Sequence, residues 1–134
     1  MRRPLIFLLI IAVVSIFLLS IFHQEPPKTE ARTLRLTCMN QIPKWPCEDY
    51  ESTDSKVIFA FEQAIAGGEK QPGNVSYIAE YQLDLIGEQE TKSYGFGLGP
   101  DRTWNGSFVK FTDSSTAYLL DKEVANGLRE ILGK

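Results

Sequence analysis

Histidine is almost absent from this chain, which holds a single one, His23, among its 134 residues. Serine and cysteine hydrolases of the triad type need an imidazole base beside their nucleophile. His23 directly follows a long apolar segment and is poorly placed for that role. The scarcity of histidine excludes such a triad. Together with the lack of any CxxC motif, it also argues against a metal site.

Cysteine is scarce as well, with only Cys38 and Cys47 in the chain. Their spacing is not the CxxC that is typical of zinc sites and of redox-active pairs. Outside the cytoplasm an even number of cysteines favours a disulfide, with Cα atoms about 4.4–6.8 Å apart. We therefore expect a structural disulfide between Cys38 and Cys47. Two free, buried thiols are the alternative.

Positive charge is also in deficit, with 14 Lys and Arg residues against 17 Asp and Glu. In residues 33–134 the deficit grows to a net charge of about −5. Such a domain lacks the positive surface that nucleic acid requires, and anionic lipid repels it. Nucleic acid is therefore not an expected partner.

A phosphate-binding glycine loop is missing too. Gly95, Gly97 and Gly99 alternate along one stretch, but they lack the dinucleotide-binding spacing and lead into a turn at Pro100-Asp101. No cofactor is therefore expected. Three glycines on one face of a strand instead predict close packing beneath a helix, with a ligand as the alternative.

What the chain does contain is an uncharged segment of 18 residues, Leu5–Phe22. As a helix it would span about 27 Å, close to the ~30 Å hydrocarbon core of a bilayer. A cleaved signal peptide is the alternative. However, the segment is longer than the ~7–15 apolar residues of a signal core, and no small-x-small cleavage site follows it. We expect an uncleaved transmembrane anchor.

The charges around this segment indicate its orientation. Arg2 and Arg3 adjoin it on the short side, whereas Lys28 and Arg32 lie further away on the long side. The positive-inside rule therefore places the N-terminus in the cytoplasm. We expect a single-pass protein of the cell membrane with four parts: a cytoplasmic tip (1–4), the anchor (5–22), a spacer (23–32) and an extracytoplasmic domain (33–134).

The first half of the domain predicts one strand and one helix. Alternation over Thr33–Cys38 indicates the strand. Asp54 or Ser55 can begin a helix that Gly67-Gly68 ends. The residues that share one face of this helix are Val57, Ile58, Phe61, Ala64 and Ile65.

The second half predicts four strands and a last helix. The expected strands are Val75–Leu85, Lys92–Leu98, Ser107–Thr112 and Thr116–Leu120, with turns at Gln71–Asn74, Gly87–Glu90 and Asp113–Ser115. The side chains expected to face water from the first of these strands are Ser76, Glu80, Gln82 and Asp84. The last helix should be capped by Asp121 and should bury Val124, Leu128, Ile131 and Leu132.

Strands that follow one another through short turns pair antiparallel. The expected fold is therefore α+β: an N-terminal transmembrane helix, then a four- to five-stranded antiparallel sheet with two helices on one face.

Arg102 and Trp104, in the long turn before Ser107, are the residues expected to bind a partner. The alternative is that Trp104 caps the edge of the sheet. Every Asp and Glu falls in a turn, at a helix start or on a polar strand face, so no catalytic residue is expected. The carboxylates that would have to converge in a hydrolase are Glu48, Asp49, Asp84, Asp101 and Asp113.

Two stretches of the domain carry a family resemblance. They are Phe59–Ile65 followed by Pro72–Val75, and Thr116–Asp121 followed by Leu128–Leu132. Through them, roughly residues 55–134 resemble small uncharacterised membrane-anchored proteins of Gram-positive bacteria, the YhfM-like kind. The resemblance implies an exported α+β domain in a bacterium and transfers no catalytic residue.

We therefore expect a non-enzymatic, extracytoplasmic binding or sensing module that is anchored in the membrane. Its expected partners are the membrane itself and another membrane or envelope protein. Two alternatives remain open. One is a hydrolase that depends on carboxylates, and the other is an accessory subunit of a membrane or envelope assembly whose anchor helix itself binds a partner.

Overall fold

The computed structural model describes residues 30–39, 46–72 and 79–134. The predicted anchor, Leu5–Phe22, lies outside the described residues, as do most of the spacer and the first part of the predicted strand Val75–Leu85. In the part of the chain that is described, no helix is long and apolar enough to cross a membrane.

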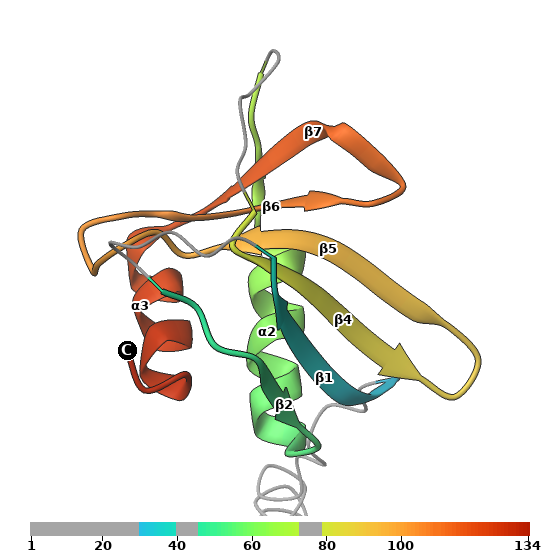
Figure 1. The fold of residues 1–134 in the computed structure, drawn as a ribbon. Coiled ribbons are helices and arrows are strands. Elements are labelled where there is room, and N and C mark those ends of the chain that lie inside the picture. The colour runs from blue at the N-terminus through green and yellow to red at the C-terminus, as the bar shows by residue number, and fades with distance from the viewer. Residues whose placement is uncertain (1–29, 40–45, 73–78) are drawn as a thin grey trace, which may run out of the picture.

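The described residues form one antiparallel sheet of seven strands in the spatial order β2-β1-β4-β5-β6-β7-β3 (Figure 1). Its strands are β1 (Ala31–Cys38), β2 (Tyr50–Ser52), β3 (Glu69–Lys70), β4 (Tyr81–Gly87), β5 (Thr91–Gly97), β6 (Gly106–Lys110) and β7 (Asp113–Leu120). Two helices accompany them, α2 (Ser55–Ala66) and α3 (Lys122–Ile131).

The α+β class and the antiparallel pairing are confirmed, but the sheet is wider than expected. The additional strands, β2 and β3, have only three and two residues. Strands this short show no alternation that a sequence pattern could reveal. They form the two edges of the sheet, where short strands leave few unpaired backbone groups for other chains. β1 also begins at Ala31, two residues before the predicted start of the domain.

Helix α2 forms as its sequence predicts. Asp54 is the N-cap, and its side chain accepts a hydrogen bond from the backbone N–H of Lys56 at 2.9 Å. This bond satisfies one of the N–H groups that the first turn leaves open. The helix ends at Gly67, and the side chains of Ile58, Phe61 and Ala64 are buried.

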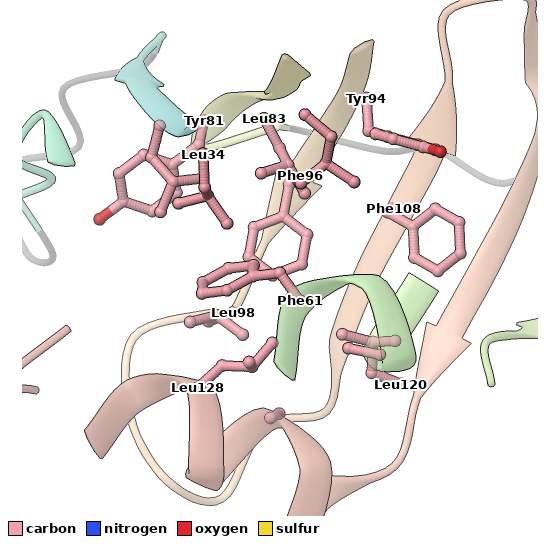
Figure 2. Close-up of a cluster of buried hydrophobic side chains, with 14 of the residues drawn as sticks. Leu34, Phe61, Tyr81, Leu83, Tyr94, Phe96, Leu98, Phe108, Leu120 and Leu128 are labelled. Atoms are coloured by element: carbon pink, nitrogen blue, oxygen red, sulfur yellow. The ribbon is translucent and has the colours of Figure 1, made fainter. Parts of the chain in front are cut away.

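Both helices contribute to one hydrophobic core (Figure 2). Phe61 of α2 packs against Phe96 of β5, with ring centroids 5.7 Å apart. Further along the sheet, Phe108 stacks on Tyr118 at 4.9 Å. Leu128 of α3 is buried in the same core. The core therefore lies between the helices and one face of the sheet.

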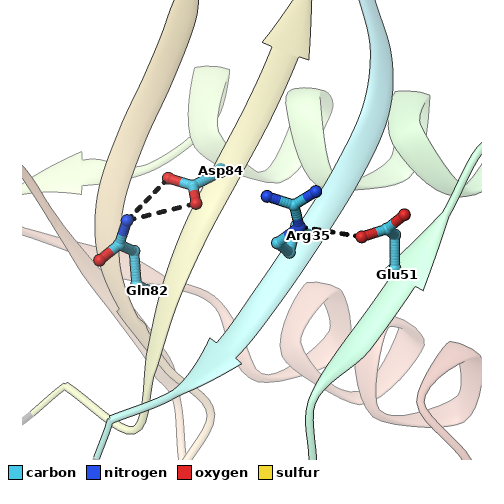
Figure 3. Close-up of polar contacts among 4 residues, drawn as sticks. All are labelled: Arg35, Glu51, Gln82 and Asp84. Atoms are coloured by element: carbon cyan, nitrogen blue, oxygen red, sulfur yellow. Dashed lines mark hydrogen bonds and ion pairs between the residues drawn. The ribbon is translucent and has the colours of Figure 1, made fainter.

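The other face of the sheet carries a polar row (Figure 3). Arg35 of β1 forms an ion pair with Glu51 of β2 at 2.9 Å. In β4, Gln82 donates to both carboxylate oxygens of Asp84, at 3.1 and 3.2 Å. Ser93 of β5 donates to the same carboxylate at 2.6 Å. Because of these neighbours Asp84 is only 9% exposed, so the prediction that it faces water is wrong.

Neither of the two described helices covers the glycines of β5, contrary to expectation. Gly95 and Gly97 are buried, but α2 packs against Phe96, whose side chain points to the opposite face of the strand. Gly99 lies beyond the end of β5, with a φ of 77°.

Two local predictions near the C-terminus are corrected. Asp113–Ser115 belong to β7, so the hairpin turn lies at residues 111 and 112. In α3, Asp121 is the N-cap as expected, but Val124 is 38% exposed. The buried residues of α3 are Ala125, Leu128 and Arg129.

Candidate functional site

The predicted binding residues Arg102 and Trp104 lie in the loop between β5 and β6, which we call the Trp104 loop (residues 98–105). Trp104 is 52% exposed. Arg102 is exposed and donates to Glu130 Oε1 at 3.4 Å and to the backbone oxygen of Lys134 at 3.3 Å. Both contacts are with the C-terminal end of α3 and the residues after it. The side chain of Arg102 therefore connects the loop to the end of that helix.

The inner side of this loop is bound by a buried carboxylate. Glu80 is 3% exposed, and its Oε1 accepts hydrogen bonds from the backbone N–H groups of Leu98 and Gly99, at 2.8 and 2.5 Å. A Cβ atom on Gly99 would lie 2.8 Å from the Cβ of Trp104, and the positive φ also disfavours other residues there. The backbone of residue 99 therefore lies this close to the side chain of Trp104 only because residue 99 is glycine.

A buried guanidinium holds the carbonyl groups of the same loop. Arg129 of α3 is 2% exposed and donates through Nη2 to the backbone oxygens of Leu98 and Trp104, the latter at 2.9 Å. Its Nη1 donates to Asn126 Oδ1 at 2.6 Å. Burial lowers the pKa of Arg129 from its ordinary value, and the negative charge of Glu80 opposes this shift.

Two buried residues of opposite charge thus hydrogen-bond to the backbone of the Trp104 loop from the protein interior. Glu80 accepts hydrogen bonds from two backbone N–H groups of the loop, and Arg129 donates to two of its carbonyl groups. All four are charge-assisted hydrogen bonds. Glu80 Oε2 and Arg129 Nε have no hydrogen-bond partner among the described residues. The arrangement is suited to holding a loop in one conformation.

The outer turn of the loop is fixed by Asp101. Its Oδ1 accepts from the hydroxyl and the backbone N–H of Thr103, at 2.5 and 2.8 Å. These bonds stabilise the charged form, and they lower the pKa of Asp101 from its ordinary 3.8.

The disulfide between Cys38 and Cys47 is present as predicted, with Cα atoms 5.7 Å apart. It lies beside the residue that binds the loop. The backbone oxygen of Glu80 accepts from Met39 N at 2.7 Å, and Cys47 Sγ lies 3.6 Å from the same oxygen. Asp49 accepts from Cys38 N at 2.7 Å. The disulfide therefore supports the backbone at Glu80.

The carboxylates considered for a hydrolase come from separate segments. Asp49 caps the end of β1, Asp84 lies in the polar row of the sheet, and Asp101 fixes the Trp104 loop. Asp113 accepts from Ser115 and Thr116 of β7, and Glu48 is exposed. In the ranges that the structure covers, no three His, Cys, Asp or Glu side chains form a group that could hold a metal ion.

Sequence reasoning missed Glu80 and Arg129. Glu80 was expected to face water with its polar neighbours, and Arg129 was not singled out. The available signal was in α3, where position 129 lies one helical turn from Ala125, on the side that the structure buries.

Comparisons with protein-family models, with curated proteins and with solved structures found no match.

Proposed function

We propose that this protein is a non-enzymatic, extracytoplasmic binding or sensing module, tethered to the membrane by Leu5–Phe22, and that it recognises its partner through the Trp104 loop. The expected partner is another membrane or envelope protein. The resemblance to YhfM-like proteins agrees with an exported domain of this kind.

The observation that carries the proposal is an exposed aromatic side chain on a loop with a fixed backbone. Exposed loop tips are usually held by few contacts. Here buried Glu80 and Arg129 bind the backbone beneath Trp104, although charged side chains are rarely buried unless paired. A loop that is ordered before binding loses less conformational entropy when a partner docks.

The side chains that this loop displays suit recognition of a protein. Trp and Arg are enriched among the residues that contribute most to interface affinity. Arg102 has a half-exposed side chain, and its contacts with Glu130 and Lys134 are long and exposed. Such contacts contribute little to stability, so Arg102 can exchange them for an acidic group of the partner.

The test is site-specific crosslinking in living cells. A photoreactive phenylalanine analogue replaces Trp104 in one variant of the full chain and Phe111 in another. Phe111 is the matched control because it is 47% exposed and lies at the opposite end of β6. We expect a discrete protein adduct from position 104 and none from position 111.

A further variant shows whether the side chain of Arg102 binds the partner or only supports the fold. Arg102→Ala should reduce the adduct formed from position 104, while the thermal unfolding midpoint stays within a few degrees of the parent. Adducts of equal yield from both positions, or an adduct that Arg102→Ala leaves unchanged, would contradict recognition through this loop.

The tether is tested separately by labelling with a membrane-impermeant maleimide in intact cells. A cysteine at Gln63, which is exposed on α2, should react, whereas a cysteine at Arg3 should react only after the cells are opened. The reverse result would place the domain in the cytoplasm.

A further inference from the structure

A pocket of about 350 Å³ opens between α2 and strands β1, β4 and β5, at the end of β5 opposite to the Trp104 loop. Figure 1 shows α2 running beside these strands. The pocket walls include Ile65 of α2, Leu85 of β4 and Tyr94 of β5. Leu85 and Tyr94 are 5% and 8% exposed, so they form its floor. The volume is within the ~300–1,000 Å³ of typical ligand pockets.

The mouth of this pocket carries more negative than positive charge. Glu30, Glu62 and Glu90 line it together with one cation, Lys92. Lys92 Nζ lies 3.6 Å from Glu90 Oε1, and these two charges offset each other. Glu30 and Glu62 have no ion-pair partner within the described ranges. An apolar floor is thus combined with two carboxylates that form no ion pair with any described residue.

We propose that this pocket binds a lysine side chain of a polypeptide partner. Lysine has a four-carbon apolar stem and a charged tip, and it buries the stem while the tip stays near water. The stem would lie against Ile65, Leu85 and Tyr94, and the ammonium group would lie between Glu30 and Glu62. The acidic domain as a whole would also attract a basic partner.

Other occupants fit these features less well. A metal ion needs ligands that converge, and none of the described acidic side chains form such a group. A neutral apolar ligand would fill the floor but would desolvate the carboxylates at the mouth without compensating them. The pocket is also separate from the Trp104 loop, so this proposal does not depend on the function proposed above.

The test uses the full chain in detergent micelles and a fluorescent pentapeptide with one central lysine between leucines. Its matched probe carries Nε-acetyl-lysine, which has the same stem without the charge. Affinities are measured by fluorescence anisotropy, and contact is located by NMR on the methyl groups of Ile65 and Leu85.

We expect the lysine peptide to shift both methyl resonances. The acetylated peptide should bind about fivefold to tenfold more weakly, because acetylation removes the charge that would pair with two exposed carboxylates. Glu30→Gln/Glu62→Gln should weaken the lysine peptide by a similar factor. Ala66→Phe should block binding, because residue 66 is exposed and lines the pocket.

Two variants serve as controls. Glu69→Gln removes one negative charge from β3, at the far edge of the sheet, and should leave affinity unchanged. Trp104→Ala should also leave it unchanged, so failure of the loop proposal and failure of the pocket proposal give different results.

Three outcomes overturn the proposal. Equal affinity for the acetylated peptide would assign the pocket to neutral apolar ligands. Methyl shifts of the same size with n-butylamine alone would assign it to small free amines. No shift of Ile65 or Leu85 at millimolar peptide would show that the pocket binds no lysine.

Discussion

At the scale of single residues, Glu80 and Arg129 are the buried charged side chains that hold the Trp104 loop. Burying a charge costs free energy unless it is paired and hydrogen-bonded. Each of these residues has backbone groups of the Trp104 loop as partners, and the two charges lie near enough for the pKa of Arg129 to respond to Glu80. Losing one of them therefore removes the opposite charge near the other and leaves its own loop groups without their hydrogen-bond partner.

Replacing Arg129 by methionine should lower the free energy of unfolding by about 3–5 kcal/mol, because it leaves the carbonyl groups of Leu98 and Trp104 without their donor and removes the positive charge near buried Glu80. The matched control is Arg102→Met, which removes an exposed arginine from the Trp104 loop itself and should cost less than about 1 kcal/mol. Urea denaturation compares the two. Similar midpoints for both variants would show that Arg129 does not hold the loop.

The carboxylate of Asp101 should titrate below its ordinary pKa of 3.8, because Thr103 hydrogen-bonds to its charged form. A lowered pKa in the folded state stabilises the fold above the unfolded pKa, and this contribution is lost as the pH falls below about 4. NMR detection of the Asp101 carboxyl carbon measures the value. Thr103→Val should raise it, and a pKa at or above 3.8 in the parent protein would refute the assignment.

At the scale of elements, the junction between α2 and β3 depends on close approach. Gly68 lies against the ring of Phe108, and a Cβ atom there would be 2.7 Å from Phe108 Cζ and 3.2 Å from Tyr118 Cβ. Phe108 is completely buried and stacks on Tyr118, so its ring has little freedom to move. The chain can leave α2 and join the edge of the sheet only with a very small residue at this position.

Gly68→Ala should therefore lower stability by about 1–3 kcal/mol, the usual cost of overpacking a core. The adjacent Gly67 is the control: its φ is −90°, and an added Cβ would meet only Gln63 O, at 3.3 Å. Gly67→Ala should change stability by less than about 1 kcal/mol, since alanine adopts this conformation without strain. The thermal unfolding midpoints of the two variants test this difference. Equal midpoints would show that a Cβ atom at residue 68 does not clash with Phe108.

At the scale of the whole molecule, the disulfide joins the end of β1 to the segment before β2, beside Glu80. Cys47 is buried in the hydrophobic core, and Cys38 packs against it. The same core also contains the larger side chains Phe61, Phe96 and Phe108, which come from other elements. The disulfide should therefore stabilise the fold without being required for it.

Reduction of the disulfide should lower the free energy of unfolding by about 1–3 kcal/mol, less than a free loop of this length would imply, because Pro43 and Pro46 already limit the loop. Circular dichroism should still show the strands after reduction. The variant Cys38→Ser/Cys47→Ser is the control and should not respond to reductant. Loss of the sheet signal, or two free thiols in protein taken from its native membrane, would contradict this account.

Much of the element order could be predicted from local pattern. Alternation indicated β1, β4 and β5, and the cap at Asp54 and the glycines after Ala66 indicated the ends of α2. β2 and β3 could not be predicted, because they exist only where β1 and β7 offer them a pairing edge. The pair Arg102 and Trp104 was chosen from turn chemistry, and its role in binding stays a prediction.

The sequence by itself determined the α+β class, the antiparallel pairing and the disulfide, because periodicity, short turns and a lone cysteine pair are properties of neighbouring residues. Only the tertiary structure decided that Glu80 and Arg129 are buried beneath the Trp104 loop. Leu98, which both residues bind, is 18 positions from Glu80 and 31 from Arg129. A polar side chain is buried when distant segments supply its partners, and no local pattern records those partners.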